Sequence, residues 1–135
     1  MIPKEWIEIV KDGLRYSYAP YSNIKVSALA ITPEGKVYRG VNVENASLGL
    51  TICAERVAIF NAVSNGERKI KTVVLTSNLD KPIYPCGACL QVMSEFGVEE
   101  VIIIHNDQVI KHSLKELFPR PFSDWKNDKS SHLNR

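Results

Sequence analysis

The sequence has little of what marks membrane and secreted proteins. No apolar run is long enough to span a bilayer, and residues 1–6 lack the apolar region of a secretion signal. The net charge is also small, because 17 basic and 15 acidic residues sum to +2. Nucleic-acid-binding domains usually carry a stronger basic excess. We therefore expect neither a nucleic acid nor a membrane as a partner.

Cysteine is scarce as well, with three residues in a chain of 135. An odd number of cysteines without a secretion signal argues against a disulfide framework and predicts a reducing, cytoplasmic location. The length and a hydrophobic content of 44% predict one domain with an ordinary core. We expect that domain to span residues 1–122, followed by a polar, frayed tail at 123–135.

All three cysteines fall in two short motifs. The first reads TICAER and contains Cys53 and Glu55; the second reads PCGAC and contains Cys86 and Cys89. A catalytic zinc ion takes three protein ligands and leaves its fourth position open, whereas a structural zinc ion has four protein ligands. Three cysteines with a carboxylate beside them therefore predict a catalytic zinc site with an acid–base residue.

Two other interpretations fit the cysteines less well. Free cysteines are often small buried hydrophobes, but these three follow the spacing of a metal site. A non-catalytic zinc module for partner binding would need a fourth ligand and would leave Glu55 unexplained. His105 and His112 are candidates for that ligand, and we interpret both as ordinary surface or strand-end histidines.

Hydrophobic periodicity predicts a mixture of helices and strands. The expected helices lie at 4–16, 52–64, 87–96 and 113–117, and the expected strands at 24–31, 36–43, 72–77, 101–104 and 108–110. The first two strands should form an antiparallel hairpin around a Pro-Glu-Gly turn. The link between the last two strands is too short for a crossover helix, so these strands should also pair antiparallel. The pattern indicates an α/β fold.

The helix expected at 52–64 is apolar nearly all round, which is typical of a buried helix, and Thr51 is its candidate N-cap. Glu55 and Arg56 in its first turn are then buried charges, which are unfavourable unless a partner compensates them. A cation near a helix N-terminus opposes the helix dipole, so Arg56 calls for an anionic partner. Three thiolates around one Zn²⁺ carry a net negative charge. We expect Arg56 to donate to the cysteine sulfurs and offset that charge.

Four ordered motifs carry a resemblance to a known family. They read APYSN, GVNVEN, CAER and PCGAC, and together they extend the likeness over roughly residues 5–122. This pattern resembles the zinc-dependent cytidine deaminases, in the small, homotetrameric type with three cysteine ligands. The resemblance implies a three-layer α/β/α fold with a five-stranded mixed sheet. It also implies a homotetramer with its active sites at subunit interfaces.

The same resemblance implies a reaction, the hydrolytic deamination of cytidine or deoxycytidine to the uridine and ammonia in pyrimidine salvage. Cys53, Cys86 and Cys89 would hold one Zn²⁺ per subunit, which lowers the pKa of a bound water. Glu55 would take the proton of that water and pass it to N3 of the ring, and would then help to protonate the leaving amine. The backbone N–H of Ala54 would contact the base.

Asn42 and Glu44 are the candidate ribose-binding residues. They lie two positions apart near the end of an expected strand, so both can point to one face. An amide and a carboxylate suit sugar hydroxyls, and the family resemblance implies that role. A carboxylate beside the ribose should repel a phosphate. We therefore expect a free nucleoside rather than a nucleotide as the substrate.

Three apolar or aromatic positions complete the expected substrate site. Tyr21 belongs to the APYSN motif, and Phe122 matches the late aromatic that closes over the base in a neighbouring subunit's site in the family. Ile24 stands where family members commonly have a phenylalanine that helps to sandwich the base. Isoleucine covers the base without the stacking contribution, which is worth roughly 0.5–1.5 kcal/mol. We therefore expect weaker nucleoside binding than is usual in the family.

Other functions stay open at this point. A relative that deaminates a cytosine-containing antibiotic or a modified nucleoside is one alternative, and a nucleoside- or zinc-binding protein without catalysis is another. An enzyme that edits polynucleotides is less favoured, because the net charge is near neutral and the link between the last two strands is short.

Overall fold

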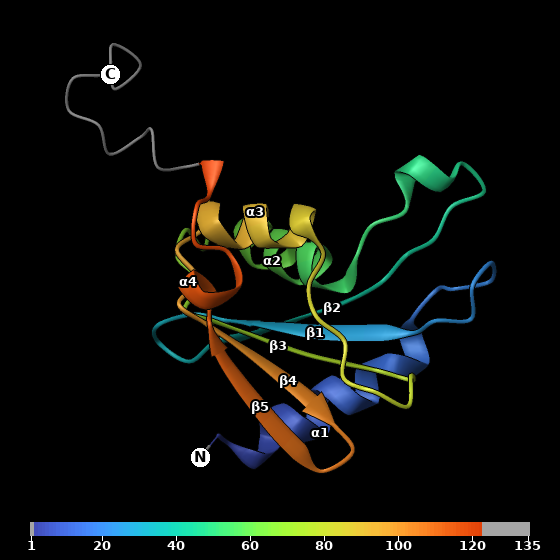
Figure 1. Cartoon of the computed structure of the whole chain (residues 1–135), viewed down its shortest axis with the longest axis horizontal. Helices are drawn as coiled ribbons and strands as arrows, with labels where there is room; N and C mark the ends of the chain where they lie inside the picture. The colour runs from blue at the N-terminus through green and yellow to red at the C-terminus, as the bar shows by residue number, and fades with distance from the viewer. Residues whose placement is uncertain (1, 123–135) are drawn as a thin grey trace.

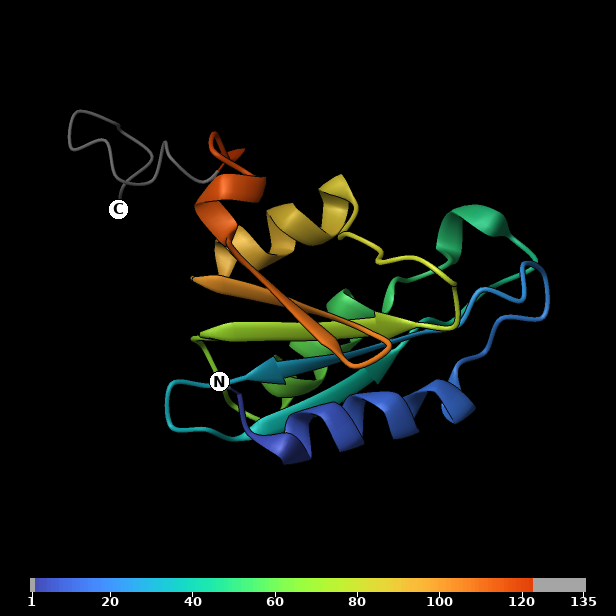
Figure 2. The same cartoon turned by 60° about the horizontal axis from the view of Figure 1, so that its bottom comes forward.

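The computed structural model describes residues 2–122, so the expected tail at 123–135 lies outside the described part of the chain. A five-stranded mixed sheet forms the middle layer (Figure 1). Helix α1 (Lys4–Gly13) covers one face, and α2 (Ala54–Ser64) and α3 (Gly87–Glu95) cover the other. Figure 2 shows the same layers after a rotation, with α1 below the sheet and α3 above it. The expected three-layer α/β/α fold is confirmed.

The sheet has the strand order β2-β1-β3-β4-β5. Its strands are β1 (Val26–Ile31), β2 (Val37–Val41), β3 (Thr72–Ser77), β4 (Glu100–His105) and β5 (Gln108–Ser113). Strand β1 pairs antiparallel with β2 and β3, β3 pairs parallel with β4, and β4 pairs antiparallel with β5. The expected hairpin and the expected antiparallel pairing of the last two strands are both confirmed. Helix α4 (Leu114–Leu117) follows β5 directly.

The central strands are buried on both faces because helices cover the sheet on both sides. Side chains along each strand alternate between two apolar clusters. The cluster toward α1 contains Val10, Leu29, Ile31, Val74, Ile102 and Ile104. The cluster toward α2 and α3 includes Ala28, Ala30, Val73, Leu75, Val101 and Ile103. The small alanines of β1 face α2, which leaves room for that helix to lie close to the sheet.

One glycine allows α2 to touch the sheet. A Cβ atom at Gly40 of β2 would stand 2.2 Å from the backbone N of Ala58 and 2.7 Å from the carbonyl O of Ala54. Both atoms belong to the helix backbone and cannot swing aside, so only a residue without a side chain permits this approach. The contact sets how close α2 lies to the sheet. The N-terminal end of this helix carries Cys53 and Glu55.

Two expectations for the start of α2 are wrong. The helix begins at Ala54 rather than at 52, because Ile52 exchanges two backbone hydrogen bonds of 3.0 Å with Val43. Thr51 is not the N-cap, since its Oγ1 instead accepts a backbone N–H of the preceding loop at 3.2 Å. Cys53 occupies the N-cap position with an extended backbone. Backbone pairing across the loop that precedes α2 overrides the local helix signal here.

Other boundaries differ by a few residues. The first helix ends at Gly13 and continues as a 3₁₀ turn (Leu14–Tyr16). The first two strands are shorter than expected, so Asn42 lies just beyond the end of β2. The last two strands are longer than expected, and α4 begins with a capping box at Ser113 and Glu116. None of the described helices is both long and apolar enough to cross a membrane.

Two loops project together beyond one end of the sheet (Figures 1 and 2). They comprise residues 17–25 and residues 42–52, and we call them the site lobe. Tyr18 joins them, because its N–H donates to the carbonyl of Asn42 at 3.0 Å and its carbonyl accepts from the N–H of Glu44 at 2.9 Å. The site lobe ends where α2 begins, so its position is tied to the cysteine at the start of that helix.

Replacing Gly40 by alanine should destabilise the fold, because α2 must then move away from β2. Overpacking of this kind typically costs about 1–3 kcal/mol. Chemical denaturation should show a lower unfolding midpoint for Gly40→Ala. Gly49→Ala is the matched control, since nothing lies within 4 Å of a Cβ atom at that position. Equal midpoints for the two variants would contradict this account of how α2 is placed.

Candidate metal centre and active site

The three cysteines meet because two helices begin at the same place above the sheet. Cys53 is the N-cap residue of α2, and Cys86 is the N-cap residue of α3. Cys89 lies in the first turn of α3 and is fully buried. Helix N-termini favour negative charge and stabilise thiolates over thiols. Both helix starts therefore direct anionic sulfurs toward one point.

The sulfur positions fit a tetrahedral zinc ion. The Sγ atoms of Cys53 and Cys86 lie 3.8 Å apart, and those of Cys86 and Cys89 lie 3.5 Å apart. All three sulfurs lie within 4.8 Å of one another. Zinc–sulfur bonds of about 2.3 Å at tetrahedral angles place the sulfurs about 3.8 Å apart. Within residues 2–122 this metal-binding group consists of three cysteines, which is the ligand number of a catalytic zinc site.

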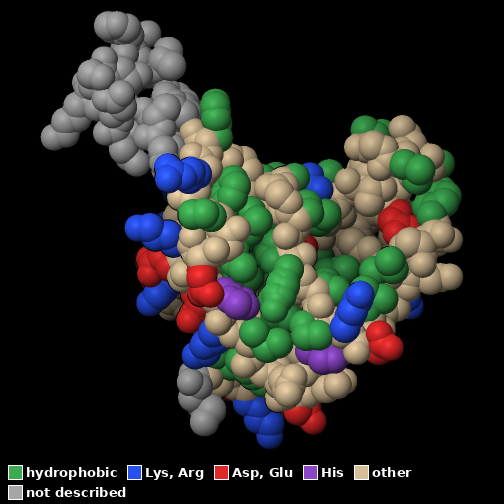
Figure 3. Space-filling model, in the orientation of Figure 1, with side chains coloured by type: hydrophobic (Ala, Val, Ile, Leu, Met, Phe, Trp, Pro, Cys, Tyr) green, Lys and Arg blue, Asp and Glu red, His purple; other side chains and the backbone are tan. Residues whose placement is uncertain are grey.

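A cavity of about 210 Å³ adjoins the cysteines. Cys53 and Cys86 line it together with Ala54 and Glu55, so a ligand in the cavity lies next to two of the metal-binding residues and the acid. Figure 3 shows the surface hollowed between the site lobe and the helical layer, with hydrophobic side chains on both sides. The cavity thus joins a metal-binding group, an acid and apolar walls in one place.

Arg56 contacts the metal-binding group as the sequence suggested. Its Nη2 donates to the Sγ of Cys53 at 3.3 Å. This bond raises the pKa of Arg56, so the guanidinium stays charged. Its Nε is buried and has no hydrogen-bond partner among the described residues. The guanidinium therefore places a fixed positive charge beside sulfurs that would otherwise form an uncompensated negative cluster.

The thiols interact strongly with one another. A hydrogen bond from Cys89, followed by one from Arg56, lowers the pKa of the Cys53 thiol to about 5. The same hydrogen bond, together with burial, raises the pKa of the Cys89 thiol. Thiolates are the form that binds metal. The group therefore holds at least one thiolate in the metal-free protein, and its other protons would leave when a metal binds.

Glu55 is an almost fully buried carboxylate, with an exposed fraction of 4%. Burial first, and then the negative charge of Cys53, raise its pKa to about 7. A carboxyl group with a pKa near neutrality both accepts and donates a proton readily. Its position in the cavity wall places this proton-carrying group beside the sulfurs.

Asn42 lines the cavity, but most of its hydrogen-bonding capacity is used within the chain. Its Oδ1 accepts from the N–H of Val26 at 2.9 Å and from the hydroxyl of Ser17, and its Nδ2 donates to the carbonyl of Ile24 at 2.8 Å. An amide nitrogen carries two hydrogens, so one N–H is left over for a ligand. Asn42 therefore also fastens the site lobe to the sheet.

Glu44 does not line the cavity in the single chain. Its carboxylate accepts from the backbone N–H groups of Tyr21 at 2.9 Å and Ser22 at 3.2 Å, and from the hydroxyl of Ser22. The hydroxyl bond first, and then the backbone bonds, hold the pKa of Glu44 below its usual value. Glu44 thus shapes the loop that carries Tyr21, and its role toward a sugar stays a prediction.

Three further expected residues lie outside the cavity of the single chain. Tyr21 and Ile24 are part of the site lobe and are 55% and 41% exposed. Phe122 is 75% exposed, and its N–H donates to Oε1 of Gln91 at 3.2 Å on α3. Contacts of these three residues with substrate stay predictions. Such contacts require that the site lobe moves or that a second chain contributes the residue.

Several residues that line the cavity are not among the predicted site residues. The aliphatic part of the cavity wall comes from Val26, Ile52 and Ile83, and the one aromatic residue in the described wall is Tyr84. Tyr84 directly precedes the second cysteine motif, which is the one local signal that could have identified it. The aliphatic residues come from separate elements, and only the fold brings them together.

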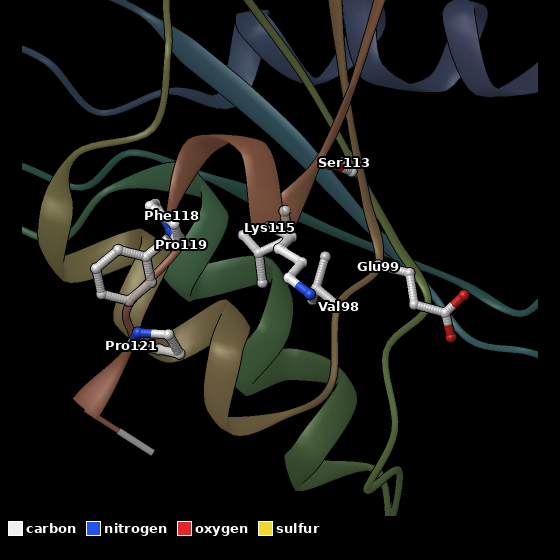
Figure 4. A pocket seen from close by; sticks show the side chains of 8 residues that line it. Val98, Glu99, Ser113, Lys115, Phe118, Pro119 and Pro121 are labelled. Carbon is white, nitrogen blue, oxygen red and sulfur yellow. The ribbon is translucent and has the colours of Figure 1, made fainter. Parts of the chain in front are cut away.

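A second cavity of about 410 Å³ lies away from the cysteines, between the ends of α3 and α4. Figure 4 shows Phe118, Pro119 and Pro121 on one side of it and Val98 on another, whereas the carboxylate of Glu99 points away. Its lining is mainly apolar and includes none of the three cysteines. The catalytic features therefore belong to the smaller cavity.

Comparison with known proteins agrees with this site. Residues 2–105 match the family described as the cytidine and deoxycytidylate deaminase zinc-binding region. The chain belongs to this family. The expected family and the expected zinc cofactor are thereby confirmed, since the matched region binds zinc and the three cysteines form the corresponding group.

Individual relatives are similar over most of their length. A probable cytidine deaminase of Dictyostelium discoideum is 44% identical over 119 residues, which cover 87% of this chain and 81% of the relative. A cytidine deaminase of Halalkalibacterium halodurans is 39% identical over 126 residues, which cover 91% of this chain and 92% of the relative. The crystal structure of cytidine deaminase from Burkholderia pseudomallei has a TM-score of 0.84 at 42% identity, with 90% of this chain and all of that chain covered.

Replacing Arg56 by glutamine should weaken zinc retention, because the sulfur cluster then lacks its compensating charge. Changes next to metal ligands typically cost about 10–100-fold in metal affinity or activity. Competition with a zinc-binding dye measures this affinity. Arg68→Gln is the matched control, since Arg68 donates to carbonyl groups near the other end of α2. Equal zinc affinity in Arg56→Gln and the parent chain would rule out this role for Arg56.

Proposed function

We propose that this protein catalyses the hydrolytic deamination of cytidine or deoxycytidine, which yields the corresponding uridine and ammonia. One observation carries the proposal, namely that a buried carboxyl group and the three-cysteine group border the same cavity. The activities named for the relatives above agree with it. Release of a reusable pyrimidine nucleoside is consistent with a place in pyrimidine salvage.

Cys53, Cys86 and Cys89 would hold the zinc ion, and Arg56 would balance their charge. When bound, zinc supplies Lewis acidity that makes a water molecule nucleophilic near neutral pH. Cys53 and Cys86 line the cavity while Cys89 is fully buried, so substrate would approach from the side of the first two cysteines. This arrangement agrees with a site that keeps one position open for water.

Glu55 would carry protons between water and substrate. It takes the proton of the attacking water and delivers it to N3 of the ring, which makes C4 electrophilic. It then helps to protonate the departing amine. Its burial and its raised pKa of about 7 suit a group that must alternate between base and acid. Its position two residues after Cys53 lets one side chain reach both partners.

The start of α2 would hold the base, and the site lobe would hold the sugar. The first N–H groups of a helix lack partners within the helix, so the N–H of Ala54 is available to a base carbonyl. Asn42 would use its remaining N–H toward a ribose hydroxyl. Glu44 would add a negative charge on this side, which favours a free nucleoside over a nucleotide.

We further propose a homotetramer with active sites at subunit interfaces. Phe60 on α2 is 46% exposed although that helix is apolar nearly all round, and Leu48 and Leu50 in the site lobe are 71% and 63% exposed. Phe122 is the most exposed large apolar side chain of the described chain, at 75%. Contiguous patches of exposed apolar side chains commonly mark protein contact surfaces. A neighbouring chain would cover them and would bring Phe122 to a site that it does not reach in its own chain.

Light scattering on the purified protein tests this assembly. The expected mass is that of four chains, and replacement of Leu48 and Leu50 by serine should reduce it. Glu8→Gln on the outer side of α1 is the control and should leave the mass unchanged. A monomeric parent chain at micromolar concentration would contradict the proposed assembly.

A cytoplasmic location is part of the same proposal. Zinc-binding thiolates need to stay reduced, and the cytosol keeps thiols in that form. In an oxidising compartment, sulfurs as close as 3.5 Å would be prone to oxidation, with loss of metal.

Replacement of Glu55 by glutamine should leave zinc in place and abolish turnover, since the amide cannot shuttle a proton. The loss expected from general acid–base catalysis is about 10²–10⁴-fold or more in kcat. Ammonia release from cytidine and zinc content are measured on the same preparation, with Glu8→Gln as control. Turnover by Glu55→Gln within a few-fold of an active parent would exclude this role, and an inactive zinc-loaded parent would exclude the proposed function.

A further inference from the structure

Tyr84 is an aromatic residue of the cavity wall. It is 49% exposed, so a bound ligand can reach it. It is the one aromatic residue among the described residues of the cavity wall, whose other apolar members are aliphatic. Nucleobases stack on aromatic side chains regardless of sequence, because every base has a π face. Tyr21, Ile24 and Phe122 do not line this cavity, so they do not provide that face within one chain.

A histidine of strand β5 packs against the Tyr84 ring. The ring centroids of Tyr84 and His112 lie 5.5 Å apart with an interplanar angle of 55°. This separation falls in the range of favourable aromatic pairs. His112 belongs to β5 and is 28 residues away in sequence, so the fold rather than the loop brings the rings together. The contact limits the directions in which the Tyr84 ring can turn.

His112 is itself held by a network at the start of α4. Its Nδ1 lies 3.1 Å from Oε2 of Glu116, and an ionised carboxylate only accepts, so Nδ1 carries the hydrogen of this bond. The other oxygen of Glu116 accepts from the N–H of Ser113 at 3.1 Å, and Oγ of Ser113 accepts from the N–H of Glu116 at 3.1 Å. The Nε2 atom of His112 is buried and has no partner among the described residues. These contacts fix the imidazole plane against Tyr84.

We propose that Tyr84 is the residue of this chain that contacts the face of the pyrimidine, and that His112, fixed by Glu116, is a positioning residue for the Tyr84 ring. The inference rests on the proposed function and specifies how its substrate site recognises a flat heteroaromatic base. Tyr84 contributes equally to binding of substrate, product and transition state, because stacking does not depend on the group at C4. Loss of the ring therefore raises KM and leaves kcat largely unchanged.

Binding of uridine and turnover of cytidine by zinc-loaded variants test the inference together. Tyr84→Leu should raise the Kd for uridine, measured by calorimetry, and the KM for cytidine by about 10-fold, with kcat within about two-fold. Tyr84→Phe keeps the ring and should match the parent chain. Tyr16→Leu is the control, because Tyr16 is equally exposed at 50% and lies against Arg15 and Arg39 instead of the cavity.

His112 is tested through a matched pair of variants. His112→Asn keeps a donor toward Glu116 but removes the ring, and should raise the uridine Kd about three-fold at unchanged kcat. His112→Phe keeps a ring against Tyr84 and should bind more like the parent. In the Tyr84→Leu background, His112→Asn should have no further effect on Kd, because the ring that it positions is gone. Separate, additive effects would overturn the positioning role.

The outcomes separate this inference from the proposed function. An active parent chain whose Tyr84→Leu variant binds uridine as tightly as the parent would overturn the inference alone. A zinc-loaded parent that neither binds uridine nor releases ammonia from cytidine would overturn both. Should Tyr84→Leu fail to fold, Tyr84→Met carries the same test, since it also removes the ring and retains an apolar side chain.

Discussion

The structure depends on two helices that begin at one point above the sheet, each on a cysteine. The N-terminal ends of α2 and α3 stabilise negative charge there, and three sulfurs collect at that place. Like charges so close together would repel one another without a cation, so the arrangement calls for a metal and for Arg56. The approach of α2 to β2 at Gly40 sets the position of the first helix start. The packing of α2 on the sheet at Gly40 therefore also positions Cys53 for the metal centre.

Burial gives the site its acid–base character. Glu55 lies in the first turn of α2, where a helix N-terminus favours the charged form, but burial and the nearby thiolate favour the neutral form. The balance brings its pKa near neutrality, which suits a group that must alternate between two protonation states. Burial of a charged carboxylate is unfavourable, and the raised pKa lets Glu55 take up a proton instead.

Much of the fold and of the metal centre could be predicted from the sequence, because their signals are local. Each cysteine motif is only a few residues long, Glu55 and Arg56 follow closely after Cys53, and the buried strands are continuous apolar runs. The start of α2 could not be predicted, because Ile52 pairs with Val43 across the loop that precedes the helix. Contacts between distant segments decide the cavity walls. The pairing of Tyr84 with His112 and the use of Asn42 to fasten the site lobe are examples of such contacts.

The most direct test of the central claim is recovery of activity during stepwise return of zinc. Zinc would be removed with a chelator, the thiols kept reduced, and ammonia release from cytidine followed as zinc is added back. We expect the metal-free protein to be inactive and its activity to rise in proportion to zinc until one ion is bound per chain. Full activity without zinc, or none at one bound zinc per chain, would contradict it.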